Sequence, residues 1–259
     1  MLIACWSAKG GVGTTVVTAG LALILSNPRP DGSAANQSRA RREADPVQTV
    51  AGGKSLDPGE VLIVDLAGDI PAVLGMPEPT GPGVADWLAA GPDVPPEGLA
   101  RIEVRVTEGL AVIPLGSQPL GHVARAEVLA GILGSEGRHV IIDCGRLDPM
   151  AEPSPSSNTV DEKAEVVRVM VSSATQSLLV TRACYLALRR YLRMPVRPSG
   201  VVLLSEPGRS LSSLDVEAVC DVPVVAEVAI EPAVARAVDS GLLAQRVPRG
   251  LARALLRAA

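Results

Sequence analysis

The chain has few of the residues that usually build metal or disulfide sites. Its 259 residues include two histidines and four cysteines, and no Cys-x-x-Cys pair occurs. The cysteines are widely scattered, at Cys5, Cys144, Cys184 and Cys220. This distribution argues against a zinc site and against a disulfide framework, and it favours buried thiols in a reducing, cytoplasmic setting.

Long apolar runs and an excess of positive charge are also missing. No run approaches about 18 uninterrupted apolar residues, so we expect no membrane span. The first apolar run is too short for the apolar part of a signal peptide. The net charge is −4, which gives no overall attraction to nucleic acid. Phenylalanine is absent although 47% of the residues are hydrophobic, so aliphatic side chains must fill the core.

Apolar runs and helix-like segments alternate along the chain, which predicts an α/β fold. The runs are apolar on both faces, as in a mostly parallel sheet covered by helices on both sides. The expected strands are 2–6, 61–66, 110–114, 139–143, 177–181, 200–205 and 222–228. The expected helices are 15–25, 84–89, 123–133, 161–174, 185–192, 211–219 and 232–241.

We expect a single domain over residues 1–259, with two segments outside the alternating pattern. Residues 27–60 are rich in Pro, Gly, Ser, Ala and Arg, with equal numbers of basic and acidic residues. A flexible surface insertion is favoured there over a DNA-binding arm. Residues 146–159 form a polar loop directly after an expected strand, where a flexible flap over a ligand is an alternative to a simple connection.

The most informative motif is Lys-Gly-Gly-Val-Gly-Thr-Thr at residues 9–15. It lies between an expected strand and an expected helix, the arrangement of a phosphate-binding loop. Glycines allow backbone N–H groups to converge on phosphate oxygens. The expected nucleotide-binding residues are Lys9, Gly10, Gly11, Val12, Gly13, Thr14 and Thr15. However, Thr14 occupies the place of the lysine that normally contacts the terminal phosphates.

Two expected strands end in a carboxylate, at Asp65 and Asp143. An aspartate at the carboxyl end of a central strand can hold Mg²⁺ or its water near bound phosphates. The Thr15 hydroxyl occupies the magnesium-ligand position of the Gly-Lys-Ser/Thr pattern. Thr15, Asp65 and Asp143 are therefore the expected metal-binding residues.

The loop and the two aspartates, in this order, resemble the MinD/ParA family of deviant-Walker-A P-loop ATPases. The resemblance extends over nearly the whole chain except residues 27–60, and it implies ATP and Mg²⁺ as cofactors and a homodimer that sandwiches ATP. It also implies that Lys9 is the signature lysine that reaches the partner's phosphates, whereas an exposed loop lysine is the alternative. Asp65 corresponds to the family's second motif, and we count Lys9 and Asp65 as catalytic candidates.

The resemblance extends to the second half of the chain. Pro232 begins a segment similar to the family's late Pro-Ala-Gly motif, and Ser205 follows a strand whose end holds an adenine-reading residue in the family. Both are therefore included in the expected nucleotide site, although a preference for ATP over GTP rests on the resemblance alone. Residues 177–181 resemble the strand before the helix that helps build the dimer face. Loss of the loop lysine resembles the CpaE/TadZ branch, which is associated with pilus assembly and polar positioning.

Two departures from the family pattern bear on catalysis. Thr14 cannot supply the charge of a lysine, and Ala67 stands where the second Asp of Asp-x-Asp would orient the attacking water. We therefore expect a nucleotide-dependent, dimeric positioning or scaffold switch with an unknown protein partner and weak or lost hydrolysis. One alternative is an active ATPase in segregation, division-site or pilus positioning, in which Lys9 from the partner subunit and either Asp69 or Asp143 restore catalysis. Another is a structural partner protein that no longer binds nucleotide.

Three further features have competing interpretations. Cys144 beside Asp143 suggests an iron–sulfur role only weakly, because no matching cysteine pair is found. Trp87 is expected to pack on the sheet rather than to anchor a partner. Residues 248–257 are expected to form a terminal helix that docks on the core; a helix on the inner membrane surface is the alternative, which would make a cytoplasmic protein peripheral to that membrane.

Overall fold

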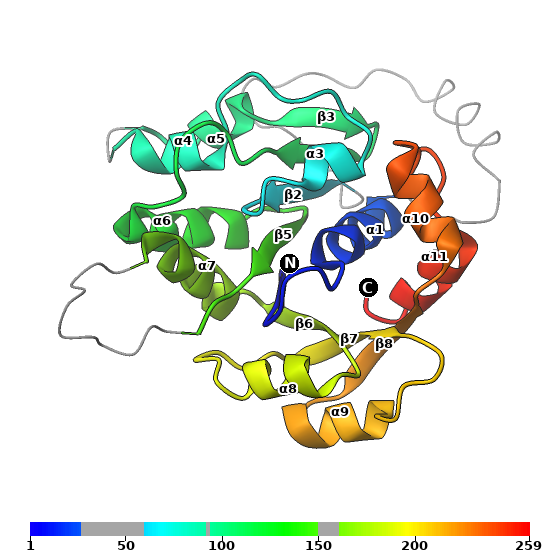
Figure 1. Ribbon diagram of the computed structural model, residues 1–259. Coiled ribbons are helices and arrows are strands. Elements are labelled where there is room, and N and C mark those ends of the chain that lie inside the picture. Colours follow the sequence, from blue (N-terminus) through cyan, green and yellow to red (C-terminus); the bar gives the residue numbers. More distant parts are fainter. Residues whose placement is uncertain (27–59, 92–93, 150–160) are drawn as a thin grey trace.

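The computed structural model describes residues 1–26, 60–91, 94–149 and 161–259, and its strands form one eight-stranded sheet (Figure 1). The strand order is β3-β4-β2-β5-β1-β6-β7-β8, and every neighbouring pair is parallel except β3 and β4. The strands are β1 (Leu2–Ser7), β2 (Val61–Asp65), β3 (Val104–Thr107), β4 (Leu110–Ile113), β5 (His139–Arg146), β6 (Gln176–Arg182), β7 (Gly200–Ser205) and β8 (Val224–Ala229). The central strands β1 and β2 are buried along their whole length, as expected for strands covered on both faces.

Helices cover both faces of the sheet. The helices are α1 (Thr14–Ser26), α3 (Ile70–Val73), α4 (Val84–Ala89), α5 (Gly98–Arg101), α6 (Val123–Gly134), α7 (Glu162–Ser173), α8 (Tyr185–Tyr191), α9 (Ser213–Cys220), α10 (Pro232–Asp239) and α11 (Arg249–Leu255). The side chains of α4–α9 share one hydrophobic core with one face of the sheet. Those of α1, α3, α10 and α11 share a second core with the other face. Both layers can be followed in Figure 1.

These observations confirm the expected α/β fold and its mostly parallel sheet. Three short elements were not expected from the sequence: β3, α3 and α5. The first is a partly exposed strand at the edge of the sheet, and the other two contain only four residues each. Such short or exposed segments bury too few side chains to leave a periodic apolar pattern. The expected insertion at 27–60 lies outside the described residues apart from Glu60, and the loop at 146–159 is described only as far as residue 149.

The C-terminal helix α11 docks on the core, as expected. Leu251 and Leu255 are buried against α1. The approach is close at Gly20, where an added Cβ would lie 2.9 Å from Cδ1 of Leu255. Trp87 in α4 is likewise buried, and the Arg125 guanidinium stacks 4.0 Å from its ring centroid. None of the helices in the described ranges is long and apolar enough to cross a membrane.

Candidate functional site

The glycine-rich loop connects β1 to α1 at the carboxyl edge of the sheet. Gly11 and Gly13 have φ angles of 72° and 91°, in the left-handed region that favours glycine. A Cβ built on either residue meets no heavy atom within 4 Å, whereas the Val12 side chain is buried. The space in front of both glycines is therefore open to a ligand that approaches the backbone closely.

Helix α1 begins where the loop ends. The Val17 amide donates to the Gly13 carbonyl at 3.0 Å, and the Thr18 hydroxyl donates to the Thr14 carbonyl at 3.0 Å. The first turn carries no acidic residue, so nothing there offsets the positive end of the helix dipole. A long helix that starts at an open glycine loop is suited to bind an anion such as phosphate.

Asp143 lies beside this loop with an incompletely satisfied carboxylate. Its side chain is fully buried, and Oδ1 accepts a hydrogen bond from the Gly145 amide at 3.2 Å. Its Oδ2 atom is buried without a partner in the described part of the chain. Burial raises the pKa of Asp143 to about 7, the Thr15 side chain lowers it, and the nearby Asp65 carboxylate raises it further. An unpaired buried oxygen next to a threonine hydroxyl fits a hydrated cation.

The carboxylate of Asp65 is hydrogen-bonded to the backbone amides of the residues that follow it. Asp65 is fully buried and pairs in register with Asp143 across β2 and β5. Its carboxylate accepts hydrogen bonds from the amides of Ala67 at 3.0 Å, Gly68 at 2.7 Å and Ile70 at 3.0 Å. Burial raises its pKa, and these three amides oppose that rise. In this structure Asp65 shapes the turn before α3, and its role toward a metal or in catalysis stays a prediction.

The turn after Asp65 contains Ala67 and the exposed Asp69. Ala67 faces Gly145, because a Cβ built on Gly145 would lie 3.0 Å from Cβ of Ala67. Asp69 precedes α3 without making a side-chain capping hydrogen bond. Its charge raises the pKa of both Asp65 and Asp143, so its carboxylate lies near the two strand ends. Asp69 is thus an exposed carboxylate near the carboxyl ends of β2 and β5.

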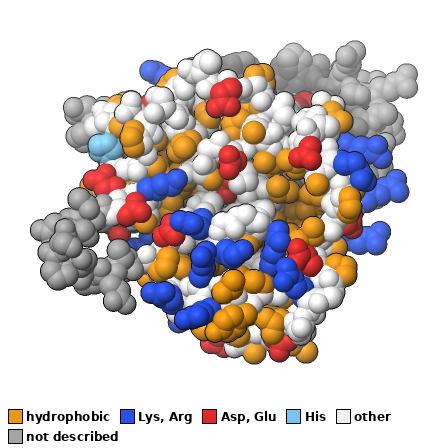
Figure 2. Space-filling model, in the orientation of Figure 1, with side chains coloured by type: hydrophobic (Ala, Val, Ile, Leu, Met, Phe, Trp, Pro, Cys, Tyr) orange, Lys and Arg blue, Asp and Glu red, His pale blue; other side chains and the backbone are white. Residues whose placement is uncertain are grey.

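Basic side chains surround the loop, and sequence reasoning missed most of them. Arg182, at the end of β6, donates from Nη2 to the Gly11 carbonyl at 3.3 Å. The aliphatic stem of Arg146, at the end of β5, lies 3.7 Å from a Cβ built on Gly10. Figure 2 shows lysine and arginine side chains gathered on this face of the molecule. Each arginine ends a parallel strand, and this position is the sequence signal that could have identified them.

Lys9 belongs to the same basic neighbourhood. Its side chain is partly exposed. A backbone amide at Ala187, and the charges of Lys9 and Arg209, lower the pKa of the Cys184 thiol at the start of α8. The charge of Lys9 is therefore felt at the start of α8, and its role toward a partner stays a prediction.

The structure brings Ser205 and Pro232 together at the same edge of the sheet. The Ser205 carbonyl accepts a hydrogen bond from the Ile230 amide at 3.0 Å, and Pro232 begins α10. Strand β7, which ends at Ser205, is separated from the loop-bearing strand β1 by β6. Both residues keep their place in the expected nucleotide site as predictions.

The described residues hold no group of three or more His, Cys, Asp or Glu side chains that could bind a metal ion by themselves. Magnesium in phosphate-binding sites is typically shared between one or two protein ligands, waters and substrate oxygens, so it needs no such group. Thr15 and the free oxygen of Asp143 meet that smaller requirement.

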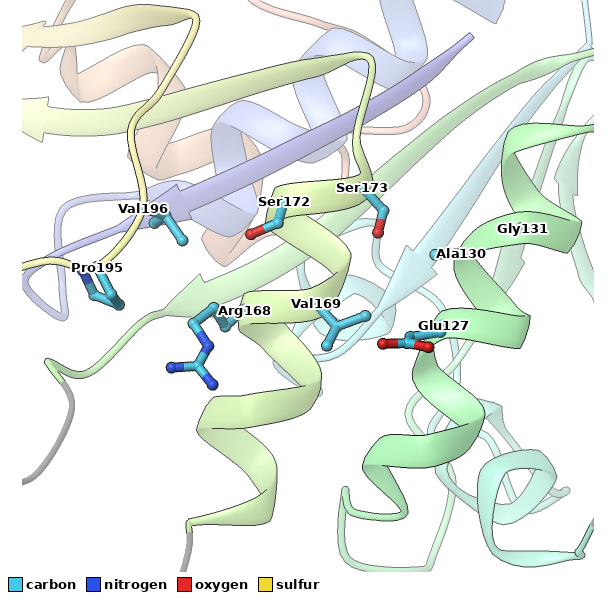
Figure 3. Close-up of a pocket in the computed structure, with 9 residues that line it drawn as sticks. All are labelled: Glu127, Ala130, Gly131, Arg168, Val169, Ser172, Ser173, Pro195 and Val196. Atoms are coloured by element: carbon cyan, nitrogen blue, oxygen red, sulfur yellow. The ribbon is translucent and has the colours of Figure 1, made fainter.

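A separate groove of about 580 Å³ lies in the helical layer over one face of the sheet (Figure 3). It runs between α6 and α7, where Glu127 and Val169 point toward one another. It is also lined by Pro195 and Val196, which precede β7. This groove therefore does not contribute to the loop site.

Solved structures with a similar fold include ParA, MinD and McdA proteins. A ParA family ATPase from Chlorobium tepidum TLS superposes with a TM-score of 0.66 at 18% identity, over 98% of this chain and 95% of that chain. MinD from Pyrococcus horikoshii OT3, complexed with Mg-ADP, superposes with a TM-score of 0.64 at 19% identity, over 98% of this chain and 92% of that chain. A McdA–ATP complex from Cyanothece, in which an aspartate is replaced by alanine, superposes with a TM-score of 0.59 at 18% identity. The match covers 99% of this chain and 94% of that chain.

The chain thus has the MinD/ParA P-loop ATPase fold, with an open glycine loop between β1 and α1. Comparison of the sequence with family models and with curated proteins gives no match. The assignment therefore rests on the three-dimensional arrangement, and the CpaE/TadZ branch stays a prediction.

Proposed function

We propose that this protein binds ATP with Mg²⁺ at the loop of residues 9–15. The observation that carries this proposal is the unpartnered Oδ2 of Asp143 beside Thr15, below a loop whose glycines leave open space for phosphates. The nucleotides in the Pyrococcus MinD and Cyanothece McdA structures support the same assignment. Thr15 and Asp143 would hold the ion or its water, which would neutralise phosphate charge.

We further propose that hydrolysis is weak or lost. Thr14 is nearly buried, and its short side chain carries no charge toward the terminal phosphates. Ala67 presents a methyl group where a water-orienting carboxylate is expected. Binding depends mainly on backbone amides and the helix terminus, so it survives both replacements.

An active ATPase is the second candidate, and the position of Asp69 favours it. This carboxylate is exposed, makes no capping hydrogen bond and lies near Asp143. A free carboxylate within reach of the phosphates could orient the attacking water in place of the missing one at position 67.

The proposed switch acts through dimerisation. The charge of Lys9 reaches the start of α8, where it lowers the pKa of the Cys184 thiol. Large apolar side chains are exposed on this helix and directly after it: Tyr185 is 68% exposed, Leu186 57% and Leu192 57%. An exposed apolar surface of this kind is suited to a second copy or another protein partner. With nucleotide bound, Lys9 would reach the phosphates of the second copy, and a cytoplasmic positioning or scaffold role follows.

A calorimetric titration with ATP and Mg²⁺ tests binding, and a phosphate-release assay tests turnover. Gly13→Val should abolish binding, because φ at Gly13 is unfavourable for valine and its side chain would enter the open space. Gly134→Val is the matched control: Gly134 ends α6 without a positive φ, and its added Cβ also meets open space.

The outcomes separate the candidates. Binding without phosphate release supports the switch, and binding with release at an ordinary rate supports the ATPase. If the parent protein does not bind ATP, the remaining alternative is a structural partner protein that no longer binds nucleotide.

A further inference from the structure

Arg182 holds a position next to the loop that no sequence motif assigns. Its guanidinium lies between the loop and the carboxyl end of β7, with Nη2 on the Gly11 carbonyl at 3.3 Å and Nη1 on Oε1 of Glu206 at 2.9 Å. Its Nε atom is buried and has no acceptor in the described ranges. The side chain as a whole is 32% exposed, so the group is held in place and still accessible from solvent.

The contact with Gly11 also orients the loop. The carbonyl of one residue and the N–H of the next point in opposite directions across a trans peptide. An arginine that holds the Gly11 carbonyl therefore also restrains the orientation of the peptide between Gly11 and Val12. The same side chain thus brings a positive charge to the loop and restrains the backbone that offers amides to an anion.

We propose that Arg182 supplies to bound nucleotide phosphates the positive charge that the loop lost with its lysine. This inference rests on the proposed nucleotide binding and deepens it. Thr14 offers no charge, and Arg182 is the guanidinium that makes a hydrogen bond to the loop in the described structure. Arginine matches phosphate geometry with several donors in one plane, so it can replace a lysine ammonium that approaches from another direction.

The other cations near the loop are less suited to this role. Arg146 forms an exposed ion pair with Asp148 at 2.7 Å, with side chains 50% and 46% exposed. Arg209 pairs with Glu206 and is 44% exposed. Solvent screens both of them more strongly than it screens Arg182. Lys9 is predicted to contact the phosphates bound by a second copy of the chain.

Glu206 competes with phosphate for Arg182. The carboxylate binds both Arg182 and Arg209, and the Arg209 side chain lowers the pKa of Glu206. A phosphate that takes over Nη1 of Arg182 leaves Glu206 paired with Arg209. The Glu206 carboxylate therefore remains neutralised by Arg209 when nucleotide binds.

The test measures the affinities of ATP, ADP and AMP, each with Mg²⁺, by calorimetry. Arg182→Gln should weaken ATP binding by about 10-fold or more, since a hydrogen bond to a charged group is lost. The loss should be smaller for AMP, which lacks the terminal phosphates. Arg105→Gln is the matched control, because Arg105 is exposed on β3 and also donates to a backbone carbonyl, that of Glu108 at 2.8 Å.

Two further variants make the test specific. Thr14→Lys in the Arg182→Gln protein should restore much of the ATP affinity, since it returns a cation to the loop. Glu206→Gln should tighten ATP binding several-fold, because it removes the competing carboxylate from Arg182. The second variant keeps the test decisive if Arg182→Gln lowers the thermal stability too far to be titrated.

The results distinguish this inference from the proposed function. If the parent does not bind ATP, the proposed nucleotide binding fails and the inference fails with it. If the parent binds ATP but Arg182→Gln matches Arg105→Gln, the inference alone is overturned. Equal losses for ATP, ADP and AMP would also overturn it, because they would show that Arg182 only supports the loop. ATP binding that is unchanged or weakened by Glu206→Gln would likewise contradict the role.

Discussion

The buried carboxylate of Asp143 lies beside Thr15, and its Oδ2 atom has no hydrogen-bond partner in the described part of the chain. Thr15 is the second residue of α1, which follows the glycine loop, whereas Asp143 lies in β5, the strand that pairs with β1. Unpaired polar atoms are rare in protein interiors and need an explanation. A magnesium ion, or a water that it holds, would provide one.

Removal of metal should therefore weaken nucleotide binding. We expect ATP affinity to fall about 10-fold or more when EDTA replaces Mg²⁺. Asp143→Asn should lower the affinity with Mg²⁺ and make the remaining binding insensitive to EDTA. Asp221→Asn is the control, because Asp221 adopts the left-handed conformation that asparagine also tolerates. Calorimetric titrations check this, and equal ATP affinity with and without Mg²⁺ in the parent would contradict the metal site.

Dimerisation should depend on both ATP and Lys9. Lys9→Ala should leave the chain folded and monomeric with ATP, since the charge that reaches the second copy is removed. Lys163→Ala, which changes an exposed lysine in the first turn of α7, should dimerise as the parent does. Sedimentation velocity with and without ATP measures the mass. A parent protein whose mass never responds to ATP would rule out the nucleotide-dependent dimer.

Restoring both missing catalytic groups should restore turnover. Thr14→Lys alone should tighten ATP binding and accelerate hydrolysis only modestly. Ala67→Asp alone should add negative charge near Asp143 without improving binding. The double variant should exceed the product of the two single effects, since both groups serve one transition state. Phosphate release is the measurement, and a parent that already hydrolyses ATP at an ordinary rate would refute the proposed loss of catalysis.

The C-terminal helix offers a matched pair of leucines for testing its docking. Leu255 is fully buried against α1, whereas the adjacent Leu256 is 47% exposed. Leu255→Ala should lower the free energy of unfolding by about 2–5 kcal/mol, because it leaves a cavity under α11. Leu256→Ala should change it by less than about 0.5 kcal/mol. Denaturant unfolding checks both values, and equal effects would show that α11 does not dock as described.

Sequence patterns predicted the elements that bury a regular apolar face. Strands β1, β2 and β7 are continuous apolar runs, and helices α4 and α6 follow a helical period, so their types and approximate bounds were predictable. The edge strand β3 was not predictable, because its side chains are partly or fully exposed and leave no clear apolar pattern. Strand β5 runs three residues past the predicted end at Asp143, since Gly145 and Arg146 continue to pair with β1.

Part of the candidate site was likewise visible in the sequence. Segment 9–15 and the two strand-terminal aspartates are local patterns, because a phosphate-binding loop is built from consecutive residues. The different environments of the two aspartates were not predictable. Asp65 accepts three amide hydrogen bonds from the turn that follows it, whereas one oxygen of Asp143 is left without a partner. That difference depends on the path of the chain after each strand.

By itself, the sequence determined the alternation of strands and helices, the glycine loop and the replacements at Thr14 and Ala67, because each is a property of neighbouring residues. Only the tertiary structure decided which distant side chains meet at the loop. Arg182 contacts the Gly11 carbonyl although 171 residues separate them along the chain. Parallel strands place their carboxyl ends at one edge of the sheet, so residues from remote segments converge there. No local pattern encodes which strands become neighbours, since strand order follows from the packing of the whole chain.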